Sequence, residues 1–231
     1  KIGRGKGSRS SARVLPGFDP NVKIRLLKEL SDQADIIVCL HAGDIERKKI
    51  RADLGITYDN DALRLIDDLR NRQVDVTAVV ITRFNGQPEA INFQKRLEKH
   101  GIKVFQHREI TDYPKNFDFI VSEDGFGANP YIPVTHPLVV VTGPGPNSGK
   151  MGTCLSQIYH EFQQRRNAHY AKFETFPVWN LPLTHPVNIA YEAATADLQD
   201  ANAIDSFHFE AYGRVAVNYN RDLQAFPLLR A

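Results

Sequence analysis

Residues 139–154 read VVVTGPGPNSGKMGTC, and this stretch carries the strongest structural signal in the chain. It begins in a run of mostly β-branched apolar residues at 138–141, which predicts a buried strand. A loop rich in glycine and proline follows and ends in Gly149-Lys150. Beyond the loop, apolar residues recur at helical spacing: Leu155, Ile158, Tyr159 and Phe162. The stretch therefore predicts a strand, a glycine-rich loop and an amphipathic helix in that order.

This order of elements is typical of a phosphate-binding loop. Backbone N–H groups in such a loop and the positive end of the following helix dipole both favour an anion, and Lys150 adds a full positive charge. N–H donors run without interruption from Asn147 to Met151, which is enough to surround a phosphate. The candidate phosphate- or nucleotide-binding residues are Gly143, Gly145, Asn147, Ser148, Gly149, Lys150, Met151 and Thr153.

The loop departs from the usual pattern in two ways. Five residues rather than four separate Gly143 from Gly149, and two of them are prolines, which have no N–H to donate. Met151 follows the lysine, where Ser or Thr would normally reach Mg²⁺. Ser148 and Thr153 are the nearby hydroxyls that would replace it as metal ligands. The alternative is a Gly/Pro turn that enters a helix and leaves the lysine solvated.

Composition narrows the classes of function. The 231 residues carry a formal net charge of +2, so no strong field favours nucleic acid or a membrane surface. No apolar run is long enough to span a membrane and no secretory signal is present, which predicts a cytoplasmic protein with no membrane partner. Cys39 and Cys154 are expected to be reduced core thiols, and the alternative for Cys154 is activation by the helix N-terminus.

Strand and helix patterns alternate along most of the chain. The expected strands lie at 34–40, 76–82, 102–105, 117–121, 138–141 and 170–173. Helices are expected from Val22, in the charged segment 46–51, from Asp59 or Asn60 through Leu69, and from Pro88 through Leu97. This alternation predicts an α/β fold with a doubly wound, mostly parallel sheet and helices on both of its faces.

Polar residues follow several of these expected strands. In a parallel sheet, ligands bind beyond the carboxyl ends of the strands. The residues expected at that edge, besides the glycine-rich loop, are His41, Asp44, Thr82, Arg83, Glu123, Asp124 and Glu174. Asp44 and Glu174 are acids that would place Mg²⁺ or orient water, and with Lys150 they form the candidate catalytic set. The alternative for each acid is a solvated loop residue or a helix cap.

The chain divides into three predicted parts. Residues 1–20 form a basic flexible tail, for which a nucleic-acid arm or the joined ends of unseen segments are alternatives. Residues 21–184 form the α/β domain with the phosphate-binding loop, and residues 185–231 form a helical extension. The extension ends just after the apolar run of Phe226, Leu228 and Leu229. We therefore expect either truncation at this end or a homo-oligomer interface.

The loop resembles those of dethiobiotin synthetase and cytidine triphosphate synthase, which are P-loop enzymes that activate carboxylates or carbonyls with ATP. In the synthase, too, a residue other than Ser or Thr can follow the lysine. Tyr170-Ala171-Lys172 is similar to the Tyr-x-Lys segment that opens the next strand in the synthetase. The resemblance is local and implies ATP or a related nucleotide with Mg²⁺ as cofactors.

A second resemblance extends from residue 13 to the end of the chain. The motifs that carry it are RVLPGF at 13–18, DLGITY at 53–58, PG at 144–145 through LSQ at 155–157, AKFETFPVWNLPL at 171–183 and HPVNIAYEAATADL at 185–198. Together they resemble an uncharacterised bacterial family whose members carry a domain of unknown function. This resemblance implies a cytoplasmic, multi-domain protein longer than this chain, with no established activity. Residues around 3–11 depart from the family pattern, which implies residues missing there.

Three hypotheses for function follow. In the first, the chain is part of an ATP-dependent, ligase- or transferase-like enzyme, in which Lys150 and the loop N–H groups hold the phosphates. Ser148 or Thr153 would place Mg²⁺ together with Asp44 or Glu174. In the second, the loop holds a small phosphorylated metabolite without catalysis. In the third, the chain is an oligomeric scaffold with a purely structural loop.

Overall fold

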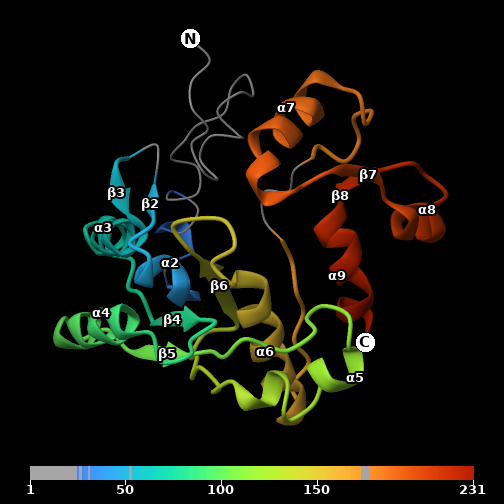
Figure 1. Cartoon of the computed structure of the whole chain (residues 1–231). Coiled ribbons are helices and arrows are strands. Elements are labelled where there is room, and N and C mark those ends of the chain that lie inside the picture. Colours follow the sequence, from blue (N-terminus) through green and yellow to red (C-terminus); the bar gives the residue numbers. More distant parts are fainter. Residues whose placement is uncertain (1–24, 26–27, 31, 52–53, 173–176) are drawn as a thin grey trace.

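The computed structural model of the chain describes residues 25, 28–30, 32–51, 54–172 and 177–231 (Figure 1). The predicted basic tail at 1–20 and the predicted acid Glu174 lie outside the described residues, as does most of the helix predicted from Val22.

A four-stranded parallel sheet forms the centre of the fold. Its strands are β1 (Ala34–His41), β4 (Ala78–Thr82), β5 (Val104–Gln106) and β6 (Leu138–Thr142), in the spatial order β5-β4-β1-β6. All three neighbouring pairs are parallel, and Ile37 of β1 lies opposite both Ala78 and Val141. The sheet confirms the predicted α/β class.

Successive strand residues point to opposite faces of the sheet, so the apolar strands give it two apolar faces. Helices pack on these faces. On one face the strands pack against α2 (Ala42–Glu46), α3 (Tyr58–Arg70) and α4 (Pro88–Lys99). The apolar cluster there includes Val38, Leu40, Ile66, Val79, Ile81, Phe93 and Leu97. On the other face, Ile37, Cys39, Ala78 and Val80 pack with Ile132 from the segment before β6. On that face the Cys39 thiol lies 3.4 Å from the Thr153 hydroxyl of α6 (Lys150–Gln163).

Two predicted elements are wrong. Residues 117–121 were expected to form a strand, but the structure has a short helix, α5 (Phe117–Ile120), whose first turn is capped by the Asn116 side chain. The charged segment 46–51 was expected to be helical, but α2 ends at its start and β2 (Ile50–Arg51) pairs with β3 (Ile56–Thr57) instead. Arg51 of β2 is buried and pairs with Asp61 of α3, so it is not the solvated helix residue that was expected.

Three further differences concern the start of a helix, the strand predicted at 170–173 and two acids predicted at a strand end. Helix α3 begins after Thr57, so Asp59 lies in its first turn and neither Asp59 nor Asn60 is the cap. Residues 170–172 are not in a strand. Exposed Glu123 and Asp124 lie in a turn before the 3₁₀ helix η2 (Phe126–Ala128), and not at the end of a strand.

The C-terminal region contains a small hairpin as well as helices. Its elements are α7 (Pro186–Ala194), η3 (Ala196–Leu198), β7 (Asn202–Ile204), α8 (Ser206–Tyr212), β8 (Val217–Tyr219) and α9 (Asn220–Arg230). Strands β7 and β8 are antiparallel. Leu228 of α9 is buried in a cluster with Leu155 and Tyr159 of α6. Part of the terminal apolar run is therefore packed against α6, which lies beside α9 in Figure 1.

Within the part of the chain that the structure describes, no helix combines the length and the apolar character needed to cross a membrane.

Candidate functional site at the loop between β6 and α6

The predicted glycine-rich loop connects β6 to α6 and packs tightly against its neighbours. Gly149 has a φ of +82°, and a Cβ there would lie 2.6 Å from the Thr82 side chain. A Cβ on Gly145 would lie 2.2 Å from the Tyr58 ring. Only glycine fits these two positions without a shift of the surroundings. Gly143 precedes them in the half-buried start of the loop.

Two polar side chains hold the loop from the sheet side. The Thr82 hydroxyl lies within hydrogen-bond distance of the carbonyl oxygens of Leu40 (3.1 Å) and Ser148 (3.0 Å). The Arg51 guanidinium donates to the carbonyl oxygen of Pro144 at 2.7 Å. The loop is thus held by side chains of strands β2 and β4, both of which come earlier in the chain.

Lys150 folds back over the loop. Its Nζ donates to the Gly145 carbonyl oxygen at 2.9 Å and to Ser148 Oγ at 3.1 Å. These two bonds keep the ammonium group beside the loop, next to the first turn of α6. A phosphate seated on the loop would meet the lysine there.

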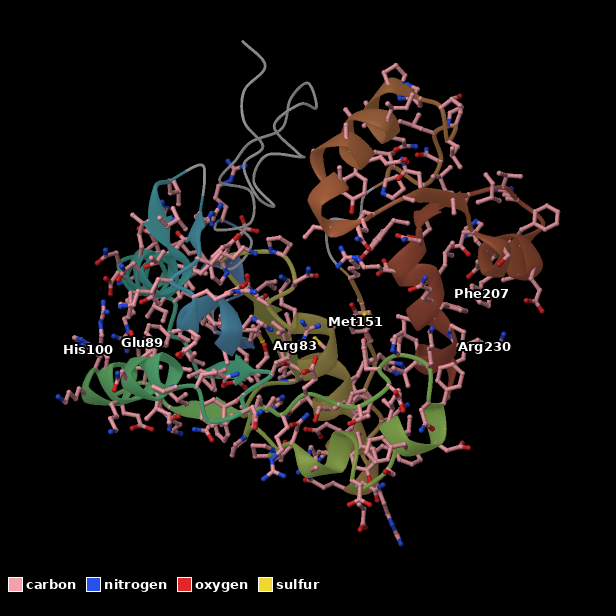
Figure 2. The ribbon with its side chains drawn as sticks, viewed as in Figure 1. Arg83, Glu89, His100, Met151, Phe207 and Arg230 are labelled. Carbon is pink, nitrogen blue, oxygen red and sulfur yellow. The ribbon has the colours of Figure 1, made fainter. Side chains whose placement is uncertain are left out.

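The first turn of α6 faces a cleft. Among the described residues, no side chain caps this helix, whose N-cap is Gly149. The first N–H groups of any helix lack intrahelical partners, and the helix dipole makes this end positive. Gly149, Lys150, Met151 and Gly152 all line the cleft. Figure 2 shows Met151 in the middle of the molecule, whereas Glu89 of α4 and His100, the C-cap of that helix, lie toward one edge.

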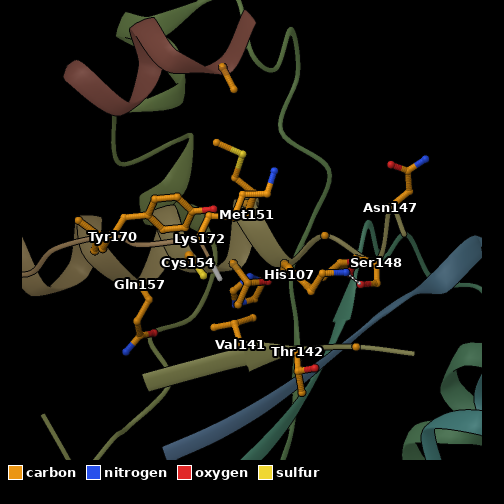
Figure 3. A pocket seen from close by; sticks show the side chains of 18 of the residues that line it. His107, Val141, Thr142, Asn147, Ser148, Met151, Cys154, Gln157, Tyr170 and Lys172 are labelled. Atoms are coloured by element: carbon orange, nitrogen blue, oxygen red, sulfur yellow. Dashed lines mark hydrogen bonds between the residues drawn. The ribbon is translucent and has the colours of Figure 1, made fainter. Parts of the chain in front are cut away.

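The cleft has a volume of about 2250 Å³. Its walls are β6, the first turns of α6, the segment 107–114 and the start of α9. Pockets for one small molecule measure roughly 300–1,000 Å³, so this cleft has room for more than a phosphate group. Tyr170 and Lys172, from the segment predicted to resemble the synthetase, also line it (Figure 3).

Both hydroxyls predicted as magnesium ligands, those of Ser148 and Thr153, already make a hydrogen bond within the protein. Ser148 Oγ accepts a hydrogen bond from Lys150, and Thr153 Oγ1 accepts one from the Cys39 thiol in a buried position. Met151 offers only a thioether. Over the described residues, no group of three or more His, Cys, Asp and Glu side chains is arranged to hold a metal ion.

Asp44 lies outside the cleft lining. It is buried in the first turn of α2, where its Oδ1 accepts a hydrogen bond from Arg47 at 2.6 Å and lies 3.7 Å from Lys49 Nζ. His41 caps the same helix by accepting the Asp44 N–H at 3.1 Å. The structure therefore brings Thr82 and Arg83 to the cleft with Lys150, but it does not bring Asp44 there.

His107 lines the cleft and was missed from the sequence. It follows β5 directly, is only 3% exposed, and its Nε2 has no hydrogen-bond partner among the described residues. Burial lowers the pKa of His107 to about 4, despite a hydrogen bond with the Pro130 carbonyl that raises it. The ring is thus a neutral imidazole at neutral pH. In the sequence, only its place just after an expected strand could have pointed to His107. His41 also follows an expected strand, so this feature alone does not distinguish the two histidines.

Arg221 contacts a loop residue that lies 74 positions away in the sequence. Its Nη1 donates to Asn147 Oδ1 at 2.6 Å. Its Nε and Nη2 donate to the two carboxylate oxygens of Asp200. Nearby, Lys172 Nζ pairs with Asp222 at 2.6 Å. The C-terminal region thus supplies charged side chains to the wall opposite the sheet.

Both cysteines are free in the structure; Cys39 is buried, as expected of a core thiol, whereas Cys154 is half-buried and lines the cleft. Burial raises the pKa of Cys39 to about 11 and the pKa of Cys154 to about 12. The positive charge of Lys150 opposes both shifts without overcoming them. The structure therefore gives no activated thiolate at either position.

Known proteins match nearly the whole chain. The family model described as "Domain of unknown function DUF1846, N-terminal" matches residues 6–231. A "UPF0371 protein" of Clostridium tetani is 63% identical over 218 residues, which is 94% of this chain and 43% of the relative. A second, from Clostridium botulinum (strain Eklund 17B / Type B), is 60% identical over 222 residues, which is 96% of this chain and 44% of the relative. These matches confirm the predicted uncharacterised bacterial family. The chain spans less than half the length of these curated relatives.

Proposed function

The chain belongs to the DUF1846 family of bacterial proteins, and we propose that it binds a phosphate group of a small molecule at the loop between β6 and α6. ATP or a related nucleotide is the first candidate ligand. The observation that carries the proposal is Lys150, which is held beside the loop at the N-terminus of α6. A full positive charge, backbone donors and the positive end of a helix dipole then act on the same anion.

The position of the loop in the sheet supports this proposal. From β1 the chain moves to β4 and β5 on one side, and then returns to β6 on the other side of β1. The order of strands therefore reverses between β1 and β6. In open parallel sheets, ligands bind at the carboxyl ends of the strands where the order reverses. The loop after β6 begins at this point.

In a catalytic form of the proposal, the whole protein is a ligase- or transferase-like enzyme and Lys150 stabilises charge on a transferred phosphoryl group. Glu174 is then the remaining candidate acid for Mg²⁺, because Asp44 is paired with Arg47 outside the cleft. More than half of each relative lies beyond the matched region, so other parts of the protein would supply the acceptor site.

A second candidate is a metal-free site for a phosphorylated metabolite. It is favoured by the hydroxyls of Ser148 and Thr153, which are both engaged within the protein, and by Met151 at the position where a metal-binding hydroxyl is usual. A phosphate held by N–H groups and a lysine needs no metal.

Calorimetric titration of the full-length protein with ATP, with and without Mg²⁺, separates these candidates. We expect Lys150→Ala to weaken ATP binding at least about tenfold, which is the loss of one charge-assisted hydrogen bond. Lys99→Ala, at the exposed end of α4, is the matched control and should bind as the wild type does.

Each result points to one function. Binding that needs both Lys150 and Mg²⁺ supports the nucleotide enzyme, and binding that needs Lys150 alone supports the metal-free site. Unchanged affinity in Lys150→Ala, or no binding of ATP and inorganic phosphate to the wild type, refutes the proposal and favours the structural loop of an oligomeric scaffold.

A further inference from the structure

Arg221 reaches the loop between β6 and α6 from the opposite wall of the cleft. It lies in the first turn of α9, and its Nη1 is 2.6 Å from the side-chain oxygen of Asn147. Both residues line the same cleft as Lys150. A second cationic side chain therefore meets the loop from the C-terminal region.

The guanidinium of Arg221 is held in one orientation. Its Nε and Nη2 both donate to Asp200, whose side chain is only 1% exposed and also accepts a hydrogen bond from the Tyr191 hydroxyl at 3.1 Å. The ring of Tyr219 lies 5.5 Å from the guanidinium carbon. With two nitrogens fixed on the buried carboxylate, Nη1 is the donor that points to the loop. Arginine is suited to this role because its five donors have a rigid geometry.

The partner of Nη1 is replaceable. Asn147 is exposed, so water can satisfy its amide oxygen once Arg221 turns to another acceptor. That oxygen is neutral, whereas hydrogen bonds from a guanidinium to phosphate are charge-assisted and roughly twice as strong. A phosphate seated on the loop would compete well with Asn147 for Nη1.

We propose that Arg221 contacts the bound phosphate from the C-terminal side of the cleft, and that Asp200 acts as its positioning residue. This inference rests on the phosphate site proposed above. Lys150 and Arg221 then place one positive charge each on opposite sides of the anion. Two charges match a terminal phosphate, which carries nearly two negative charges at neutral pH, better than a phosphodiester, which carries one. The ligand class is therefore a phosphomonoester or a nucleotide with a terminal phosphate.

Titration of the full-length protein with AMP and with cyclic AMP tests this inference, because the two ligands share a base and sugar but differ in phosphate charge. We expect AMP to bind more tightly than cyclic AMP. Arg221→Ala should weaken AMP binding about tenfold or more, and should reduce the preference for AMP. Arg221→Lys keeps the positive charge but lacks the rigid guanidinium geometry, so its affinity for AMP should lie between those of the wild type and Arg221→Ala. Arg214→Ala, at an exposed arginine in the same region, is the control.

A double-mutant cycle tests Asp200. If Asp200 acts by holding Arg221, then Asp200→Asn weakens AMP binding in the wild type but adds no further loss in Arg221→Ala. Equal losses in both backgrounds would overturn the positioning role. The thermal unfolding midpoint of every variant identifies losses that come from misfolding.

The two proposals fail in different ways. If Lys150→Ala abolishes AMP and ATP binding while Arg221→Ala and Arg221→Lys bind as the wild type does, the role of Arg221 is overturned and the phosphate site stands. If AMP, ATP and inorganic phosphate all fail to bind the wild type, both proposals are overturned.

Discussion

The guanidinium of Arg51 donates a hydrogen bond to the carbonyl oxygen of Pro144, across 93 positions of sequence. The same nitrogen, Nη1, also pairs with Asp61 of α3, and both charged side chains are buried, with exposed fractions of 7% and 1%. The loop after β6 is therefore held by a charged pair built from β2 and α3. The pair links the stability of the fold to the shape of the loop.

Removing the buried guanidinium of Arg51 should lower the free energy of unfolding more than removing the partly exposed guanidinium of Arg64. In Arg51→Met, Asp61 stays buried without its closest charge partner, and we expect the free energy of unfolding to fall by about 3 kcal/mol. Arg64→Met is the matched control, because Arg64 bonds the same carboxylate at 2.6 Å but is 36% exposed. Its loss should be below about 1 kcal/mol. Urea unfolding measures both, and equal losses would contradict the importance of the buried pair.

Two glycines near the start of α6 should respond oppositely to alanine. Gly149→Ala places a Cβ at a positive φ and against Thr82, so we expect the free energy of unfolding to fall by about 2 kcal/mol. Gly152 lies in the helix with no atom within 4 Å of an added Cβ. Gly152→Ala should stabilise the protein by up to about 1 kcal/mol. Thermal or urea unfolding of both variants checks this, and a neutral Gly149→Ala would show that the loop is not constrained as described.

His107 should make stability depend on pH. Its pKa is about 4 in the folded protein against an ordinary value of 6.5, so between these values the unfolded chain binds a proton that the folded chain does not. The stabilising effect is complete above pH 6.5 and is lost progressively as pH falls toward 4. Between pH 7 and pH 5, this histidine should lower the free energy of unfolding by about 2 kcal/mol.

His107→Gln removes the titrating group and should flatten this part of the pH profile in urea unfolding. His100→Gln, at the exposed C-cap of α4, should keep the wild-type slope. A wild-type slope in His107→Gln would mean that another group dominates the pH dependence.

The cysteines should be nearly inert in the folded protein. At pH 8 a thiol with a pKa of about 11 or 12 is ionised in about one molecule in a thousand or fewer. We expect an aromatic disulfide reagent to modify Cys39 and Cys154 slowly in the native state and rapidly in urea. Asp75→Cys, at an exposed position, supplies a fast-reacting native control. Rapid labelling of Cys154 in the native protein would contradict this expectation and support the alternative that the helix N-terminus activates its thiol.

Most of the central fold could be predicted from local pattern. The apolar runs that became β1, β4 and β6 are long and β-rich, and α4 and α6 have regular apolar spacing with a proline or glycine at the start. The strand predicted at 117–121 was wrong because a short apolar run fits a strand or a helix equally well. Here the Asn116 cap, a single side-chain hydrogen bond, accompanies the helical turn.

The residues of the candidate site also include some that local sequence predicts and some that it does not. The turn from Gly143 to Lys150 was predictable because its glycines, prolines and lysine are adjacent in sequence. The contacts of Arg51, Arg221 and Asp200 were not predictable, because their partners lie on other elements and only the folded chain brings them together. Asp44 was expected at the cleft from its place after β1, but its own neighbours Arg47 and Lys49 hold it elsewhere.

The central position of β1 determines which backbone amides exchange with deuterated solvent last. Every residue of this strand from Ala34 to Leu40 is buried, and strands pair with it on both sides, whereas β5 and β6 are the outer strands. Exchange in outer strands requires only local opening, but exchange in β1 requires the whole sheet to separate. The amides of Ile37 and Val38 therefore report the global free energy of unfolding, independently of any ligand or activity.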